Sequence, residues 1–550
     1  MFPPKRRRPR TEGENRLPRR SCLVAVLLLW TLPLWAGLAQ ASEITIGLSA
    51  APNSADPHFH ALGPNNMLAG HVFDPLIRID EKLGLKPALA TSWTLEGDRT
   101  WRFALRQGVK FQDGTPFTAA DVVYSLCRVL HPSGPTHSFQ TASRALETVE
   151  VVDDHTVRMR MRVPDPAFLD MLTGFYIISA HSAGAGPMVF NADTACGDIA
   201  APPASDFDGG RMANGTGPYR LTQYLSGDRL TLAANPGYWG GKPRWDKVAM
   251  RALPNAGARL AGLLAGELDL IENPSAQDLA VIKAHGDLGF VVVPSNRMMF
   301  LQPDVERDPS PQVSGPNKLR DPRVREAISL AIDRKAIVSR LLDGMAVPAD
   351  RYTPPGLFAA LQMAPAQPYD PARARALLAE AGATKMALTL SASRDRFVGD
   401  AAVAQAIGQY LTRVGITTTV EALPQVSFFP RRTKREFSLA LGSWGYGSEG
   451  SAYFLRPWLA TPDAVRGYGA SNYGGYRSAA FNEALLRGLG EMDDDRRAAA
   501  LRKAETIALS DHAIIPLYWD TSLWAFKDRY RYAGRADQLT RADDLTPKDK

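Results

Sequence analysis

The sequence predicts an α/β protein, and two patterns carry that prediction. Over residues 322–420, amphipathic helical segments alternate with short apolar strands, as in a sheet covered by helices. The segments around Trp93 and at 101–105 alternate apolar and polar side chains, as half-buried strands do, and residues 149–152 and 156–161 are expected to pair as strands around a turn at Asp153-Asp154. The chain has 550 residues, 45% of them hydrophobic and 22% charged, which is typical of a globular protein with several domains.

The N-terminal half is expected to be rich in strands. Thr118 and an acidic residue three positions on form a capping pattern, which predicts a helix over residues 121–130. Glycine, proline, alanine and serine are frequent between residues 164 and 214, so an irregular segment is expected there. The other expected elements are strands at 44–48, 149–152, 219–224, 229–234, 268–271 and 289–293 and a helix at 256–265.

The C-terminal half is expected to hold most of the long helices. Apolar residues share one face over residues 322–342 and predict a single helix there. The other expected elements are helices at 370–380, 401–414, 479–487 and 496–510 and strands at 387–391, 416–420 and 514–518.

Residues 1–41 have the three parts of a secretory signal peptide. Basic residues precede an apolar run at 22–34, and Ala39-Gln40-Ala41 forms a small-residue cleavage site. An uncleaved anchor is the alternative, but the run is short for a bilayer and contains Pro33. Arg19-Arg20 leaves the twin-arginine and the general export routes both open. We therefore expect a periplasmic protein.

The mature chain is expected to be nearly neutral. Residues 1–41 hold 8 Lys/Arg and 2 Asp/Glu, and removing these from the totals of 64 and 57 leaves 56 and 55. The basic excess thus belongs to the leader, and it does not indicate nucleic-acid binding. Cys127 and Cys196 lie in the mature part. In an oxidising compartment they either form a disulfide or stay as buried thiols, and both alternatives remain open.

Five groups of segments resemble, in order, the oligopeptide-, dipeptide- and nickel-type solute-binding proteins of ABC importers, known as family 5. They are residues 89–93 with TWRFALRQGVKFQDGTPFTAADVVY at 100–124, GTGPY at 215–219 with NPGYW at 235–239, GELDL at 266–270, residues 321–344, and IPLY at 515–518. They extend over essentially the whole mature chain.

This resemblance implies a clamp of the type II periplasmic-binding-protein fold, with two lobes and an extra subdomain. Lobe I would comprise residues 42–72, 214–295 and 512–550, the extra subdomain residues 73–213, and lobe II residues 296–511. A peptide-like or related small solute would be captured between the lobes and delivered to a membrane-embedded ABC permease. The protein would be a monomer with no cofactor.

The glycine-rich segment 441–455 is the first candidate for contact with a solute, because glycine lets backbone approach closely. Trp444 is expected to form an apolar wall, with core packing as the alternative. Glu449 is expected to pair with an ammonium group, with a solvated loop acid as the alternative. Peptide-binding relatives carry an acid where Gly447 or Gly450 stands here. This departure favours a glutathione- or opine-type solute over a plain peptide.

Two arginines are candidates for the solute's carboxylate, which a guanidinium binds through two parallel hydrogen bonds. Arg394 stands where dipeptide-type relatives place such an arginine, and Arg396 is its rival. An ion pair with Asp395 or Asp400 is the alternative for either.

Three more residues are expected at the ligand site. They are Ser54 in the first loop, Arg297 at an expected crossing between the lobes, and Tyr473. His58 and His60, with His71 nearby, suggest a metal site, but no acid or cysteine completes a ligand set, so we expect no metal.

The sequence contains no G-x-S-x-G, H-E-x-x-H or Walker A motif, so we do not expect an enzyme. The alternatives are a signalling or chaperone-type binding protein without a transport role and, less favoured, an exported hydrolase.

Overall fold

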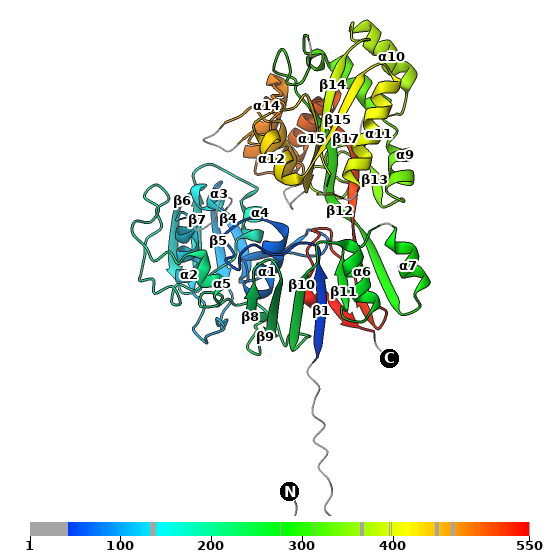
Figure 1. Cartoon of the computed structure of the whole chain (residues 1–550). Coiled ribbons are helices and arrows are strands. Elements are labelled where there is room, and N and C mark those ends of the chain that lie inside the picture. Colours follow the sequence, from blue (N-terminus) through cyan, green and yellow to red (C-terminus); the bar gives the residue numbers. More distant parts are fainter. Residues whose placement is uncertain are drawn as a thin grey trace, which may run out of the picture. The chain divides into compact units, whose positions relative to one another are not determined.

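The computed structural model describes residues 42–131, 139–275, 277–313, 315–363, 368–394, 396–397, 399–445, 450–463 and 468–548. Over these residues the α/β class is confirmed, since helices alternate with the strands of a large mixed sheet (Figure 1). Among the same residues, no helix is both long enough and apolar enough to cross a membrane.

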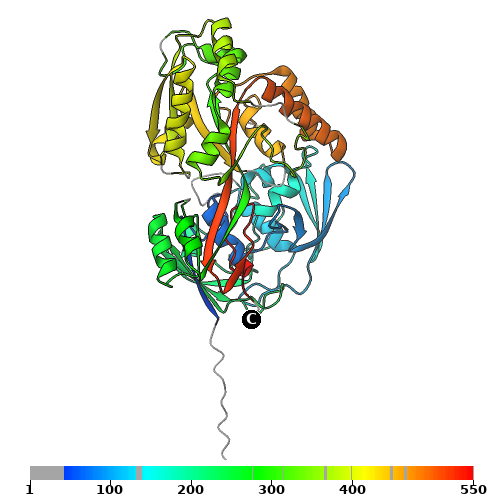
Figure 2. The same ribbon diagram turned by 90° about the vertical axis from the view of Figure 1, so that its right-hand side faces the viewer.

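The large sheet has eleven strands, in the order β15-β14-β16-β12-β17-β11-β1-β10-β9-β8, with β13 paired to β17. Its two long central strands, β12 (Leu288–Pro303) and β17 (Ile515–Lys527), run antiparallel to each other (Figure 2). The sequence predicts only 289–293 and 514–518 as strands, because the polar residues 295–297 interrupt the apolar pattern. Both strands are longer because β12 pairs with β16 on one side and with β17 on the other.

One end of the sheet is formed by three separate stretches of the chain, namely residues 43–72, residues 219–284 and the C-terminal residues. Its elements are β1 (Glu43–Leu48), α1 (Gly63–Val72), β8 (Tyr219–Leu225), β9 (Arg229–Ala234), β10 (Lys247–Ala252), α6 (Ala256–Leu264), β11 (Leu270–Glu272), α7 (Asp278–Ala284), β18 (Tyr530–Tyr532) and β19 (Leu545–Pro547). A core of buried side chains from β1, α1, β9, β10 and β17 joins these segments.

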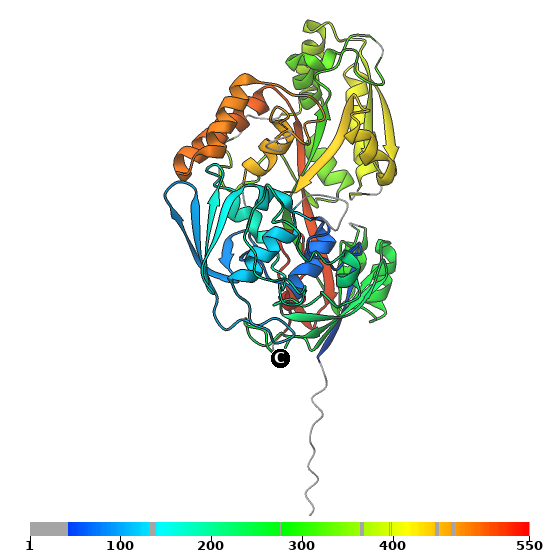
Figure 3. The same ribbon diagram turned by 90° about the vertical axis from the view of Figure 1, so that its left-hand side faces the viewer.

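A separate four-stranded sheet, ordered β4-β5-β7-β6, lies in the segment between α1 and β8 (Figure 3). The elements of this segment are β2 (Ile77–Ile79), β3 (Leu85–Pro87), β4 (Ala90–Glu96), β5 (Thr100–Leu105), α2 (Ala119–Arg128), α3 (Gln140–Arg144), β6 (Leu146–Asp153), β7 (Thr156–Met161), α4 (Phe168–Met171) and α5 (Ala204–Asp208). The predicted helix start is confirmed, since the Asp121 carboxylate accepts from the Thr118 backbone N–H at 2.8 Å.

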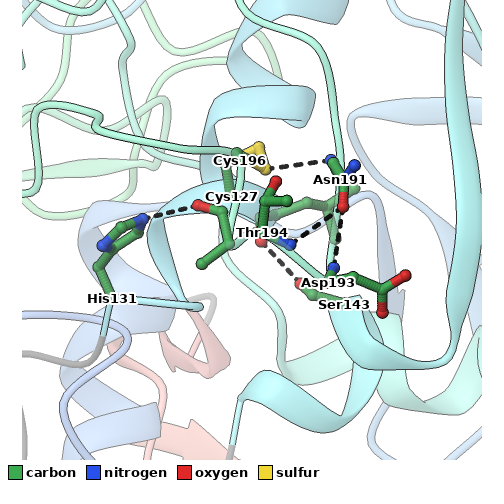
Figure 4. Close-up of a disulfide and its surroundings, with 9 residues drawn as sticks. Cys127, His131, Ser143, Asn191, Asp193, Thr194 and Cys196 are labelled. Carbon is green, nitrogen blue, oxygen red and sulfur yellow. Dashed lines mark hydrogen bonds between the residues drawn. A yellow bond between two sulfur atoms is a disulfide. The ribbon is translucent and has the colours of Figure 1, made fainter.

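The irregular segment predicted at 164–214 is also confirmed, because only short helices interrupt it. Cys196 in this segment forms a disulfide with Cys127 of α2 (Figure 4). Of the two alternatives for these cysteines, the structure has the pairing.

The other end of the sheet carries the long helices. The elements there are α8 (Pro322–Ala331), α9 (Arg334–Ala336), β13 (Ala346–Pro348), α10 (Pro371–Glu380), β14 (Ala387–Ser393), α11 (Asp400–Arg413), β15 (Thr417–Leu423), α12 (Gln425–Thr433), β16 (Leu439–Gly445), α13 (Ala452–Leu459), α14 (Ala479–Gly490) and α15 (Asp494–Ser510). Two apolar cores form here, one around β14, β16 and α11 and the other around α13, α14 and α15.

The single helix predicted over 322–342 is wrong. Helix α8 ends at Ala331, and α9 begins after Asp333, whose side chain caps it by accepting from the Ala336 N–H at 2.9 Å. The buried guanidinium of Arg334 donates to the backbone carbonyls of Ser329 and Pro516. These bonds to two other segments favour the break over a continuous helix.

Candidate functional site

Three neighbouring strands bring charged and aromatic side chains together where β12 and β17 cross between the two ends of the sheet. Met298 of β12 pairs with Trp444 of β16 on one side and with Trp519 of β17 on the other. Arg297 precedes Met298 on β12, and Asp520 follows Trp519 on β17. This register brings Arg297 and Asp520 to neighbouring positions, whereas Trp444, paired with Met298, has its side chain on the other face of the sheet.

Arg297 is half-buried and is held by neutral partners. Its Nε donates to the Gln538 side-chain oxygen at 3.1 Å, and Nη1 donates to the Ser443 hydroxyl at 3.3 Å. Its guanidinium carbon lies 5.8 Å from the centre of the Phe397 ring. No carboxylate forms an ion pair with Arg297 within the described part of the chain. Burial, together with repulsion from Arg396, lowers the pKa of Arg297 to about 10, so it stays charged at neutral pH.

Arg396 approaches the same ring as Arg297. Its guanidinium carbon lies 5.0 Å from the Phe397 ring centre, within the range of a cation–π interaction. Its backbone N–H donates to the Asp400 carboxylate at 3.1 Å, which fixes the loop that follows β14. Two guanidinium groups therefore share one aromatic ring.

Two acids act on this pair, Asp520 on both arginines and Asp400 on Arg396. Burial raises the pKa of Asp520 to about 6, and attraction to Arg297 and Arg396 opposes that rise. The carboxylate accepts from the Thr521 backbone N–H at 2.9 Å. Among the described residues, no carboxylate forms an ion pair with either guanidinium. The cluster of Arg297, Arg396 and Asp520, which we call the arginine cluster, therefore has N–H groups that an anionic group can accept from.

Trp444 is half-buried on the other face of the sheet, where it packs against the apolar core around α13, α14 and α15. Its Nε1 donates to the Tyr453 carbonyl at 3.1 Å, and its ring lies 5.7 Å from the Tyr453 ring and 5.6 Å from that of Trp458. Because its polar atom is already bonded, Trp444 offers a neighbouring molecule an apolar surface only.

The other predicted site residues lie elsewhere or outside the described residues. Ser54 is 2% exposed, and its hydroxyl donates to the Asp208 carboxylate at 2.8 Å. Arg394 is exposed, and its backbone N–H donates to the Leu423 carbonyl. Tyr473 packs edge-on against Trp458. Glu449, like Gly447, lies outside the described residues.

Gly450 explains one departure from the peptide-binding relatives. Its φ is +64°, and a Cβ at this position would lie 2.1 Å from the Phe358 carbonyl oxygen. An acid cannot occupy this position without moving the backbone.

Sequence reasoning missed Asp520, Phe397, Ser443 and Gln538. Asp520 carried one signal, since it is a charged residue inside the apolar run from 513 to 526. Nothing local placed it beside Arg297, because that proximity depends on the pairing of β17 with β12.

A cavity of about 690 Å³ lies away from this cluster, lined by β4, β5, α14 and α15 among others. Its charged groups already have partners. Asp493 accepts from the Arg496 N–H at 3.0 Å, Asp494 pairs with Arg497 at 2.9 Å, and Asp165 accepts from the Ala167 N–H at 2.9 Å. We therefore take the arginine cluster, whose two guanidiniums form no ion pair among the described residues, as the candidate site.

The histidines of the N-terminal region take part in internal hydrogen bonds. His58 Nε2 bonds to the Tyr176 carbonyl at 2.8 Å. His71 Nδ1 bonds to the Met67 carbonyl, and its Nε2 accepts from the Ala542 N–H. Across the residues that the structure describes, no group of three or more His, Cys, Asp or Glu side chains is placed to hold a metal ion.

Residues 84–465 match the family model of bacterial extracellular solute-binding proteins, family 5 Middle. Two similar proteins are heme-binding protein A of Haemophilus influenzae (27% identity, covering 82% of each chain) and di/tripeptide-binding protein 2 of Pseudomonas aeruginosa (27%, covering 91% of this chain and 94% of that protein). A similar solved structure is the periplasmic binding protein DppA of Helicobacter pylori with the peptide STSA. It has a TM-score of 0.75 and 22% identity, and the match covers 92% of this chain and 99% of that one.

Proposed function

Since the chain belongs to the family 5 bacterial extracellular solute-binding proteins, we propose that its arginine cluster binds the carboxylate of a peptide-like solute. The fold is that of the type II periplasmic binding proteins, and the protein is a solute-binding component of an ABC importer. Members of this family bind solutes rather than transform them. That this chain has no catalytic activity is part of the proposal.

One observation carries the choice of ligand class, namely that two guanidiniums approach one ring, Phe397, and form no ion pair among the described residues. Arg297 is half-buried and Arg396 is exposed, so a solute can reach the pair from solvent. A carboxylate matches the donor fork of an arginine and would accept from N–H groups that these side chains leave unused.

The arrangement of β12 and β17 supports a clamp mechanism. We propose that residues 42–72, 214–295 and 512–550 act as lobe I, 296–511 as lobe II and 73–213 as the extra subdomain. Arg297 lies where β12 passes between the lobes, so closure of the lobes would enclose a solute bound there. Asp520, Glu449 and Tyr473 are proposed to contact the rest of the solute, and Arg394 remains the rival of Arg396.

We further propose that the protein is exported to the periplasm by cleavage after Ala41 and acts there as a monomer. The order of charge, apolar run and cleavage signal in residues 1–41 supports this. The mature protein recovered from the periplasm is expected to begin at Ser42, which N-terminal sequencing and intact-mass measurement would check. A retained leader would instead indicate an anchor.

Native mass spectrometry of the mature protein tests the binding role itself. A small molecule that copurifies and leaves on denaturation is expected, and its mass identifies the solute. A signalling or chaperone-type protein would be favoured if the solute is bound but its uptake is unchanged in cells that lack this protein.

Replacement of Arg396 by glutamine is expected to raise the dissociation constant of that solute by at least roughly tenfold, because one of the two cations is lost. Isothermal titration calorimetry measures the change. Arg394→Gln is the matched control, because Arg394 is two positions away and is exposed like Arg396, whereas the contact with the Phe397 ring is that of Arg396. A large effect of Arg394→Gln and none of Arg396→Gln would transfer the carboxylate contact to Arg394.

A further inference from the structure

Helix α12 presents three arginines near its C-terminal end that differ in their partners. Arg431 pairs with Glu421 at 2.8 Å and with Glu436 at 3.4 Å, and Arg435, just beyond the helix, pairs with Glu306 at 2.5 Å. Arg432 lies between them. Within the described residues, its side chain forms neither a hydrogen bond nor an ion pair, and its Nε is buried without an acceptor.

Aromatic rings surround the Arg432 guanidinium instead. Its central carbon lies 5.6 Å from the ring centre of Phe428, 5.0 Å from Phe429, 5.4 Å from Trp458 and 5.6 Å from Tyr473. These rings hold the cation in place, but they do not supply acceptors for its N–H groups. Burial lowers the pKa of Arg432, as expected for a cation that lacks a counterion.

A second donor on the same aromatic group also lacks an acceptor. Trp458 is 1% exposed, and its Nε1 is buried without a hydrogen-bond partner among the described residues. Buried donors are nearly always bonded in folded proteins, so two such donors on one cluster point to an acceptor from outside the described residues. Arg432 as a whole is only half-buried, which leaves part of its side chain accessible from solvent.

We propose that Arg432, framed by Phe428, Phe429, Trp458 and Tyr473, is a second anion subsite that binds a carboxylate group. A carboxylate accepts two parallel hydrogen bonds from one guanidinium, and the Arg432 guanidinium has N–H groups without an acceptor among the described residues. Trp458 also contacts Trp444 of β16, the strand whose Ser443 accepts from Arg297, so this subsite and the arginine cluster lie on one strand. The inference deepens the proposed function, because it assigns to the solute an additional acidic group, as in a dicarboxylate or an acidic peptide.

Titration of the mature protein with glutarate tests this subsite without knowledge of the natural solute. The protein is labelled with 5-fluorotryptophan, and the Trp458 resonance is assigned by its loss in Trp458→Phe. Glutarate at constant ionic strength is expected to shift this resonance saturably. In Arg432→Met the affinity is expected to fall at least roughly tenfold, whereas Arg431→Met, the control on the same helix, keeps it.

Two results would overturn the inference. One is that glutarate shifts the Trp458 resonance of the unmodified protein no more than KCl at the same ionic strength does. The other is that Arg432→Met binds glutarate with unchanged affinity. A shift that is lost in Arg396→Gln but kept in Arg432→Met would also overturn it, while leaving the proposed function intact. Conversely, a glutarate site that depends on Arg432 in a protein with no copurified solute would uphold the subsite and not the proposed function. Unchanged resonances of the other tryptophans show that each variant is folded.

Discussion

Replacing Arg128 with methionine is expected to lower the free energy of unfolding by about 3–5 kcal/mol, because it leaves a buried carboxylate without its guanidinium. Arg128 Nη1 and Nη2 donate to the two carboxylate oxygens of Asp56 at 2.8 and 2.6 Å. The Arg128 side chain is 1% exposed and that of Asp56 is 0% exposed. Urea unfolding followed by near-ultraviolet circular dichroism measures the change.

Arg158→Met provides the matched control. Arg158 pairs with Glu96 at 2.6 Å, which is as short as the Arg128 contact, but its side chain is 40% exposed. Water replaces such a contact at little cost, so a much smaller loss of stability is expected. Equal effects of the two substitutions would show that burial does not set the cost. In the double variant Arg128→Met/Asp56→Leu, part of the lost stability should return, because no charge is left behind.

The Arg128–Asp56 pair also shows where prediction from the sequence stopped. The loop after β1 was expected to line the ligand site through Ser54. In the structure this loop is held by polar contacts to distant segments, with Ser54 bonded to Asp208 of α5 and Asp56 to Arg128 of α2. Nothing in the local sequence distinguishes a loop that contacts a solute from a loop anchored to its own fold, because partners 72 and 154 residues away decide the difference.

Elements whose signals are local were predicted well. The capping pattern at Thr118 and Asp121, the alternation in β5 and the turn between β6 and β7 depend on neighbouring residues, and the structure confirms these elements. The failures arose where tertiary contacts override local pattern. β12 continues past the polar residues because it pairs with β17 on both sides of a register shift between Pro294 and Met298. The helix expected at 322–342 breaks because Asp333 caps a new helix by accepting from Ala336 and because Arg334 donates to Pro516 of β17.

The candidate site also combines features that the local sequence predicts with features that depend on tertiary contacts. Residue type identified Arg297, Arg396 and Trp444 as candidates. The structure places the two arginines at one ring and Trp444 on the other face of the sheet. Asp520, an acid that acts on both arginines, becomes relevant only through the register of β17 against β12. Arg432 was not identified from the sequence. Among the described residues it is distinguished by having no acidic partner, whereas Arg431 and Arg435 each pair with a glutamate.

Removing the disulfide by the double substitution Cys127→Ala/Cys196→Ala is expected to lower the stability of the segment between α1 and β8 by about 4 kcal/mol. The two cysteines are 69 residues apart, and a cross-link over a loop of this length removes much of the conformational entropy of the unfolded chain. The bond also supports a strained turn, since Ala195 and Cys196 have φ of +50° and +59°. Without the bond, this turn is held by weaker contacts, such as the hydrogen bond between His131 Nε2 and the Ala195 carbonyl at 2.7 Å (Figure 4).

Thermal unfolding with and without dithiothreitol measures this contribution. The midpoint of the unmodified protein should fall to that of the double variant when reductant is added, and the midpoint of the double variant should not change. A protein equally stable in both conditions would show that the apolar core around α2 and the four-stranded sheet holds this part of the chain unaided. Cys127 and Arg128 are adjacent on α2, so their substitutions test two interactions of one helix. One is the disulfide to Cys196, and the other is the ion pair with Asp56 in the loop after β1. If both substitutions strongly lower the stability, the position of α2 depends on both interactions and not on its apolar contacts alone.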